Sequence, residues 1–328
     1  MQDRGGKLTI TPFYNCLPKS HGLCYSKSME THIAREEIQR CIPHLGIGTI
    51  EPIGKGEQNE AFLVNQKLIF LFPKKRSTDW MKPQAALLPE LKKYVSAPIP
   101  QFLYSSRDSQ GNIVCVGYPM LSGEHISREF GQQHPNMGEK PIQELIKFIS
   151  QISEVPLATA RAAGVTEVNR KNDYEHTLAK FRNLPKDDLT PEILNFVEES
   201  YATHLGNSEN FNYTPVLVHG DLRPQNLLFA SHGDLTGILD FGCLAISDPA
   251  CEIGVAERSW GRKKFLRQFF ARYPDMDTEN FRRRLDFEKI NQRTNAYCFG
   301  VRTNREEHKN WAIRELATLA NNAPRMEF

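Results

Sequence analysis

The stretch that decides the fold is HGDLRPQN, residues 219–226, followed nineteen residues after Asp221 by DFG, residues 240–242. The apolar run at residues 214–218 predicts a short β-strand that carries Asp221 just beyond its C-terminal end. The polar residues of this stretch are therefore expected to be held in place by short strands.

Two further apolar runs predict a β-hairpin whose turn is formed by residues 231–237. The runs are residues 227–229 and 238–239. The hairpin would bring Asn226, at its entry, and Asp240, at its exit, to the same end as Asp221. A carboxylate that accepts a hydroxyl proton would then lie beside an amide and a carboxylate that can hold Mg²⁺. This arrangement predicts phosphoryl transfer.

Composition is that of an ordinary soluble globular protein, with 40% hydrophobic and 24% charged residues. No apolar run approaches the roughly 20 residues that a membrane span requires, and the N-terminus has no apolar signal region. Seven cysteines without a C-x-x-C pair indicate reduced structural thiols. We therefore expect a cytoplasmic protein. Its net charge of +2 gives no reason to expect nucleic acid or membrane as a partner.

Periodicity divides the chain into three parts and predicts an α+β fold. Residues 1–27 form an N-terminal extension, residues 28–119 a β-rich N-lobe, and residues 120–328 a mainly helical C-lobe. The boundary falls in the stretch GYPMLSG, which is rich in glycine and proline. Helices in the C-lobe are expected near residues 140–155, 158–163, 191–204, 248–271, 278–297 and 304–321.

A glycine-rich turn lies between two predicted strands of the N-lobe, at Gly54-Lys55-Gly56. Glycine at these positions lets backbone N–H groups approach a phosphate, which a larger side chain would prevent. A tight hairpin turn without a ligand is the alternative.

Together these motifs resemble the aminoglycoside phosphotransferase family, whose members have a two-lobed protein-kinase-like fold. The resemblance covers nearly everything from Ser28 onward, and the FP ending of the third strand and the later AAG resemble the 2''-aminoglycoside phosphotransferases. The matching pieces are GKGEQN at 54–59, IFLFP at 69–73, LLP at 87–89, ARAAG at 160–164, HGDLRPQN, LDFG and DPA at 248–250.

The resemblance implies a role for each residue of the main motif. Asp221 would be the catalytic residue, and Asn226 and Asp240 would hold Mg²⁺ on the nucleotide phosphates. Without the resemblance, Asp221 could be an Asx-turn residue and Asn226 a cap. His219 would brace the loop, whereas Arg223 could reach a phosphate, pair with an acid or be solvated.

The co-substrate implied by the resemblance is ATP or GTP. The turn that contains Gly54, Lys55 and Gly56 would bind its phosphates. Tyr118 and Met120 in the linker would meet the purine through backbone groups.

Two positions depart from the family pattern. The third strand of the family carries a lysine or arginine two residues before its proline, and here that residue is Leu71. Its acidic partner on the next helix is replaced by Gln84. Loss of both partners leaves no unpaired charge in a partly buried site. Lys55, or Lys74 just beyond the strand, could supply the missing cation.

The expected function is Mg²⁺-dependent transfer of the γ-phosphate to a hydroxyl of a small molecule, with an aminoglycoside-type antibiotic as the first choice. Aminoglycosides are polycations, yet the region after Asp248 is basic, and only a few acids could face such a substrate. These acids are Glu252, Glu257 and Glu288. The alternatives are a kinase for another metabolite (a sugar, a choline-like alcohol or a macrolide) and a catalytically weak pseudokinase. We expect a monomer or weak dimer.

Overall fold

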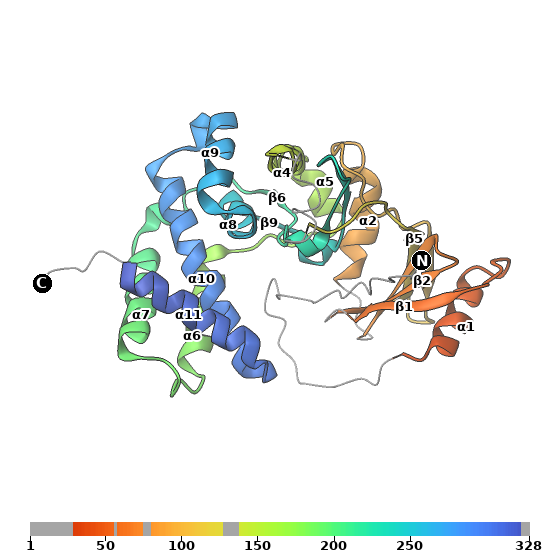
Figure 1. The fold of residues 1–328 in the computed structure, drawn as a ribbon, viewed down its shortest axis with the longest axis horizontal. Coiled ribbons are helices and arrows are strands. Elements are labelled where there is room, and N and C mark those ends of the chain that lie inside the picture. The colour runs from red at the N-terminus through yellow and green to blue at the C-terminus, as the bar shows by residue number, and fades with distance from the viewer. Residues whose placement is uncertain (1–28, 56–57, 75–79, 127–137, 323–328) are drawn as a thin grey trace, which may run out of the picture. The chain divides into compact units, whose positions relative to one another are not determined.

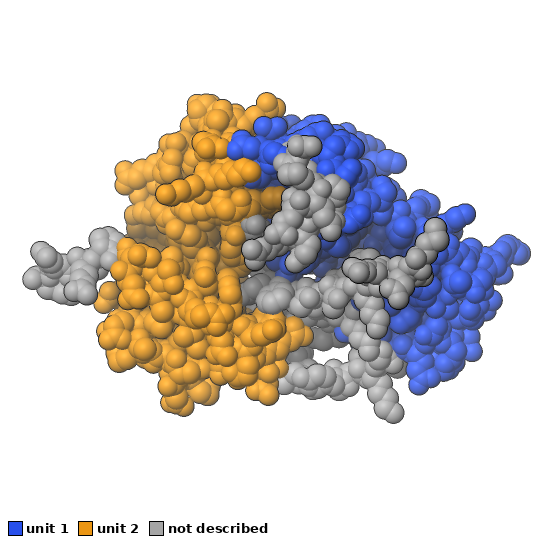
Figure 2. Space-filling view, in the orientation of Figure 1, with its two compact units in different colours: residues 1–165, 221–244 blue, residues 166–220, 245–328 orange. Residues whose placement is uncertain are grey.

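The computed structural model describes residues 29–55, 58–74, 80–126 and 138–322. The chain forms two compact units, coloured separately in Figure 2. The first contains Met1–Val165 and Asp221–Leu244, and the second contains Thr166–Gly220 and Ala245–Phe328. The lobe boundary expected at residue 120 stays a prediction.

A five-stranded antiparallel sheet forms one end of the first unit, as Figure 1 shows. Its strand order is β1-β2-β3-β5-β4. The turn between the second and third strands uses Asn65 and Gln66 with φ of 52° and 54°, values typical of a hairpin turn. The strands are β1 (Ile50–Lys55), β2 (Asn59–Val64), β3 (Leu68–Pro73), β4 (Tyr104–Arg107) and β5 (Ile113–Pro119).

Each face of this sheet has its own apolar cluster because side chains alternate along a strand. On one face, Phe62, Phe70 and Phe72 pack with Ala34 and Ile38 of helix α1 (Thr31–Cys41). The other cluster joins β3 and β5 to helix α2 (Met81–Leu91). Its members are Leu71, Trp80, Met81, Ala85, Phe102, Ile113 and Val116.

The first unit also contains the predicted hairpin. Strand β7 (Leu227–Phe229) pairs with β8 (Leu235–Ile238), so β8 begins three residues earlier than expected. The turn is shorter than expected because two backbone hydrogen bonds close it. The Ala230 N–H donates to the Asp234 carbonyl oxygen, and the Gly233 N–H donates to the Ala230 carbonyl oxygen. Helices α4 (Lys140–Ser153) and α5 (Leu157–Ala162) and the short turns η3 (Pro224–Asn226) and η4 (Phe241–Cys243) complete the unit.

The second unit is mainly helical and is centred on the long helix α10 (Glu279–Thr303). This helix packs against α6, α7, α8 and α11. A two-stranded sheet of β6 (Val216–Val218) and β9 (Ala245–Ser247) accompanies them. The other helices are α6 (Arg170–Arg182), α7 (Pro191–Gly206), α8 (Pro249–Trp260), α9 (Arg262–Arg272) and α11 (Glu306–Asn322), with η2 (Ser208–Phe211) and η5 (Pro274–Met276).

One helical prediction needs correction, and one helix was not predicted. The helix expected over residues 248–271 is divided at Gly261, whose φ of 83° ends α8 before α9 begins. Helix α6 was not predicted, although Asn169 caps it by accepting a hydrogen bond from the Asn172 N–H at 3.0 Å. The α+β fold class is confirmed. Among the described residues, no helix is both long and apolar enough to cross a membrane.

Candidate active site

Asp221 lies in the loop before β7 and is held by a neighbouring arginine. Its Oδ1 accepts from Arg223 Nε and its Oδ2 from Arg223 Nη2, both at 2.5 Å. The two residues are only 3% and 6% exposed. Of the alternatives that the sequence left open for Arg223, the structure therefore shows pairing with an acid and excludes a solvated side chain.

Asn226 ties this loop together. Its Nδ2 donates to the backbone oxygen and to Oδ2 of Asp221, both at 2.9 Å. Its backbone oxygen accepts from the N–H of Leu239 at 2.7 Å, which closes the hairpin beside Asp240. The structure thus brings Asp221, Asn226 and Asp240 to one end of the hairpin.

Asp240 lies at the exit of the hairpin in the left-handed conformation, with φ of 59°. Apart from glycine, aspartate and asparagine adopt this conformation more readily than most residues. Its Oδ1 accepts from the Gly242 N–H at 3.3 Å and so caps η4. A Cβ at Gly242 would lie 2.8 Å from Oε1 of Gln58. Gln58 therefore lies close to the Asp-Phe-Gly motif. Gln58 was not predicted as a site residue, although it belongs to the glycine-rich motif at residues 54–59.

The two aspartates influence each other electrostatically. Burial raises the pKa of Asp221 to about 7 against the lowering effect of Arg223, and the charge of Asp240 raises it further. The pKa of Asp240 is also raised, because the surrounding protein disfavours its charge more than Gly242 and Arg223 favour it. The Asp240 residue is exposed, however, and this exposure limits the size of its shift.

The oxygen atoms at this end of the hairpin fit a hard divalent cation. Because Asn226 uses its amide nitrogen on Asp221, its side-chain oxygen remains to act as a ligand. Asp240 contributes an exposed carboxylate. Magnesium sites commonly combine one or two such oxygen ligands with water and substrate phosphates. Within the described residues, no group of three or more His, Cys, Asp or Glu side chains could hold a metal ion.

The residues expected to bind nucleotide lie in the sheet of the first unit or directly after it. Gly54 and Lys55 end β1, but nothing is described of the Lys55 side chain, and Gly56 lies outside the described residues. Tyr118 is buried opposite Ile69. Met120 is 47% exposed, and its N–H donates to Lys67 at 2.8 Å.

Leu71 and Gln84 do not form a polar pair. Leu71 packs into the apolar cluster between the sheet and α2, facing Val116 across the strand pair. Gln84 is buried, and its Nε2 donates to Trp80 O of the preceding turn at 3.2 Å. Apolar packing therefore occupies the position where the family pattern has an ion pair.

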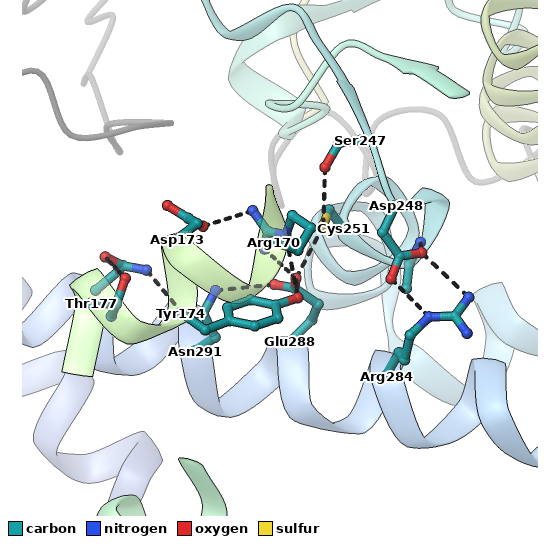
Figure 3. Close-up of polar contacts among 12 residues, drawn as sticks. Arg170, Asp173, Tyr174, Thr177, Ser247, Asp248, Cys251, Arg284, Glu288 and Asn291 are labelled. Carbon is teal, nitrogen blue, oxygen red and sulfur yellow. Dashed lines mark hydrogen bonds and ion pairs between the residues drawn. The ribbon is translucent and has the colours of Figure 1, made fainter. Parts of the chain in front are cut away.

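The acids considered for a cationic substrate are all buried inside the second unit. Glu252 accepts from the Gly220 N–H at 2.9 Å, and Glu257 from Arg262 at 2.6 Å. Glu288 accepts from Arg170, from Tyr174 at 2.5 Å and from Cys251 at 3.0 Å, as Figure 3 shows. With exposures of 1–2%, these carboxylates bind partners in the interior and present no acidic surface.

Three arginines of the basic region after Asp248 pair with acids. Arg284 donates to Asp248 at 2.7 Å, and Arg282 pairs with Asp277. Arg262 bridges Glu257 and Asp286 at 2.6 Å each. These contacts account for three arginines of the basic region.

Comparisons with known proteins bear on the family and the fold. Residues 49–284 match the family described as phosphotransferase enzymes. A GDP and kanamycin complex of APH(2")-IIia is 28% identical with a TM-score of 0.79, covering 89% of this chain and 100% of that one. A macrolide 2'-phosphotransferase from Brachybacterium faecium, 18% identical with a TM-score of 0.64 over 90% and 99% of the chains, shares the fold.

An uncharacterized Bacillus subtilis protein, YcbJ, is 24% identical over 219 residues, which are 63% of this chain and 70% of that protein. The expected likeness to the 2'' branch is confirmed by APH(2")-IIia. The kinase-like two-lobed fold and the phosphotransferase class of enzyme are confirmed as well. The chain belongs to the phosphotransferase enzyme family.

Proposed function

We propose that this chain transfers the γ-phosphoryl group of ATP or GTP to a hydroxyl of a small molecule, with an aminoglycoside as the acceptor. The observation that carries the proposal is the fixed carboxylate of Asp221 beside Asn226 and Asp240 at one end of a hairpin. Catalysis of this reaction depends mainly on positioning and charge neutralisation, which such a site can supply.

Asp221 would orient the acceptor hydroxyl and take its proton. The acceptor oxygen forms the new bond to the γ-phosphorus while the bond to the β–γ bridging oxygen breaks and the nucleoside diphosphate leaves. A base with a pKa of about 7 suits this role, since general bases work best when their pKa lies near the operating pH.

Asn226 and Asp240 are the residues that would hold Mg²⁺. When bound, the ion would neutralise charge on the nucleotide phosphates. The turn containing Gly54, Lys55 and Gly56 would lie against those phosphates. Because the N–H of Met120 is bonded to Lys67, this residue would meet the purine through its carbonyl oxygen, while Tyr118 would contribute other backbone atoms.

The choice of acceptor rests on the relatives. The APH(2")-IIia structure holds GDP and kanamycin, and other structures with this fold are macrolide phosphotransferases. The buried state of Glu252, Glu257 and Glu288 means that these three acids give no added support for a polycation. A macrolide, a sugar or a choline-like alcohol remains the alternative acceptor.

The test is a phosphorylation screen. The purified chain is incubated with Mg²⁺ and either ATP or GTP against aminoglycosides, macrolides and hydroxylated metabolites, and mass spectrometry detects a product heavier by one phosphoryl group. We expect an aminoglycoside product that disappears when a chelator is added. A complete screen without any phosphorylated acceptor, from a protein that is folded, would overturn the proposal.

A specific observation favours one competing function. The apolar packing of Leu71 and the inward bond of Gln84 remove the ion pair that holds nucleotide phosphates in the family pattern. A weak pseudokinase that binds a ligand without turnover would retain nucleotide binding in calorimetry but give no product in the screen.

A further inference from the structure

Arg223 has one nitrogen that its neighbours do not use. Nε and Nη2 bind the two oxygens of Asp221, but Nη1 is buried and has no hydrogen-bond partner among the described residues. A buried guanidinium N–H without a partner is costly, because it has lost its water without gaining another acceptor. An acceptor supplied by a ligand would satisfy it.

The carboxylate that Arg223 holds suggests which ligand group could supply this acceptor. An acceptor hydroxyl bound to Asp221 would lie about 3 Å from the carboxylate, and the phosphorus it attacks would lie a further 3–3.5 Å away. Arg223 touches the same carboxylate at 2.5 Å. The transferred phosphoryl group would therefore come within reach of the guanidinium.

We propose that Arg223 is a catalytic residue that binds the terminal phosphoryl group of the nucleotide through Nη1 while its Nε–Nη2 edge positions Asp221. This inference rests on the proposed function and adds a specific phosphate ligand to it. Arginine suits both contacts, because its planar group has five donors and can bind a carboxylate and a phosphate on different edges.

The inference also bears on the missing ion pair. Leu71 cannot donate to a phosphate, and the apolar cluster around it leaves no charged group at that place in β3. Arg223 comes from a different element, the loop before β7. It would supply positive charge at the terminal phosphate, and not at the inner phosphates that a cation on β3 would contact.

A purely structural Arg223 makes a different prediction. If the residue only braced Asp221, its removal would disturb the loop and weaken triphosphate and diphosphate binding to the same extent. If Nη1 binds the terminal phosphoryl group, removal would weaken triphosphate binding alone. The ratio of the two dissociation constants separates these possibilities and requires no acceptor and no turnover.

The experiment is calorimetric titration of the full chain and of R223Q with Mg²⁺ and nucleotide. Each protein is titrated with a non-hydrolysable triphosphate analogue and with the diphosphate, in the adenine and guanine series. We expect R223Q to weaken triphosphate binding roughly ten- to a hundredfold, the loss typical of a charge-assisted hydrogen bond, and diphosphate binding less than about twofold. R223K should recover part of the loss, since it keeps the charge.

A second pair of variants tests whether misfolding of R223Q causes the loss of affinity. Asp221 without Arg223 would be an unpaired buried acid, so D221N is compared with D221N/R223Q, in which neither side chain is charged. The same selective loss of triphosphate affinity is expected. Equal losses for both nucleotides, or none, would overturn the inference. A wild-type chain that binds neither nucleotide would instead contradict the proposed function.

Discussion

Two buried networks in this molecule each pair an arginine with a carboxylate, but they differ in how their residues are held. In the first unit, Asp221 and Arg223 are two residues apart in one loop. In the second unit, Arg170 of α6 binds Glu288 of α10 across 118 residues of sequence. The donors to Glu288 among the described residues all lie on helices and are Arg170, Tyr174, Cys251 and Asn291. Arg223, in contrast, retains a nitrogen without a partner among the described residues.

The pKa directions of the two acids are opposite. Burial raises the pKa of Asp221 to about 7 even though Arg223 and Asn226 lower it. Burial would also raise the pKa of Glu288, but Arg170, Tyr174 and Cys251 together hold it below its ordinary value. The fold therefore disfavours the charge of Asp221 and favours that of Glu288. Such a difference separates a site poised for chemistry from one that holds helices together.

The largest effect is expected for D221N. Loss of the base should lower kcat roughly 10²–10⁴-fold, as is typical for a general base. Stability should fall less than in E288Q, because the amide leaves Arg223 without its carboxylate but also removes a charge that the fold disfavours at neutral pH. Steady-state kinetics and thermal unfolding of the same preparation check both parts. A D221N protein that is inactive only because it is unfolded would remove the contrast between the two networks.

For E288Q the larger effect is expected on stability. The amide would leave Arg170 and Tyr174 without their carboxylate, so unfolding by urea should become easier by about 3–5 kcal/mol. The matched control is D286N on the same helix, whose acid is 56% exposed and should change stability by less than about 1 kcal/mol. Equal stability of E288Q and D286N would show that the buried network does not hold the helices.

The first network could be foreseen from sequence and the second could not. Asp221, Asn226 and Asp240 occur within twenty residues, so a hairpin alone brings them together. Glu288 and its partners Arg170, Tyr174 and Cys251 come from three helices. Their pairing depends on how α6, α8 and α10 pack, and no local pattern encodes that.

The same limit explains other differences between expectation and structure. Helix α6 has a nearly uniform mixture of polar residues around its axis, so periodicity did not reveal it although Tyr174, Leu178 and Phe181 are buried. Glu252 and Glu257 were expected as possible substrate ligands because sequence does not show that both are buried. Nor does it show that Arg262 pairs with Glu257.

A pH-dependent effect is expected at His204, beside the Glu288 network. The ring stacks on Phe287 at 3.7 Å and contacts Tyr174 edge-on at 5.3 Å, and its Nε2 has no partner among the described residues. Burial lowers the pKa of His204 from 6.5 to about 4. The neutral ring is therefore the form that the second unit accommodates.

The direction of the pH effect follows from proton counting. Between pH 4 and 6.5 the unfolded chain carries a proton on His204 and the folded chain does not, so acid favours unfolding. This residue should account for at most about 3 kcal/mol of the stability lost as pH falls from 7 to 4. H204F should show a smaller loss than wild type in urea unfolding over that range. An identical pH dependence in the two proteins would contradict the assignment.

The smallest expected effect is on nucleotide affinity and concerns the cation that is absent from β3. It distinguishes a contact to the inner phosphates from a contact to the terminal phosphate. If Lys55 replaces that cation, K55A should weaken nucleotide binding about tenfold, because one charge-assisted hydrogen bond is lost. K74A should have little effect, since Lys74 lies beyond the end of β3. Unlike R223Q, K55A should weaken diphosphate and triphosphate binding equally, because both nucleotides carry the inner phosphates. Calorimetry of the three variants checks this pattern. If neither K55A nor K74A loses nucleotide affinity, Lys55 does not replace the missing cation. Arg223 would then be the cation proposed to bind the nucleotide phosphates.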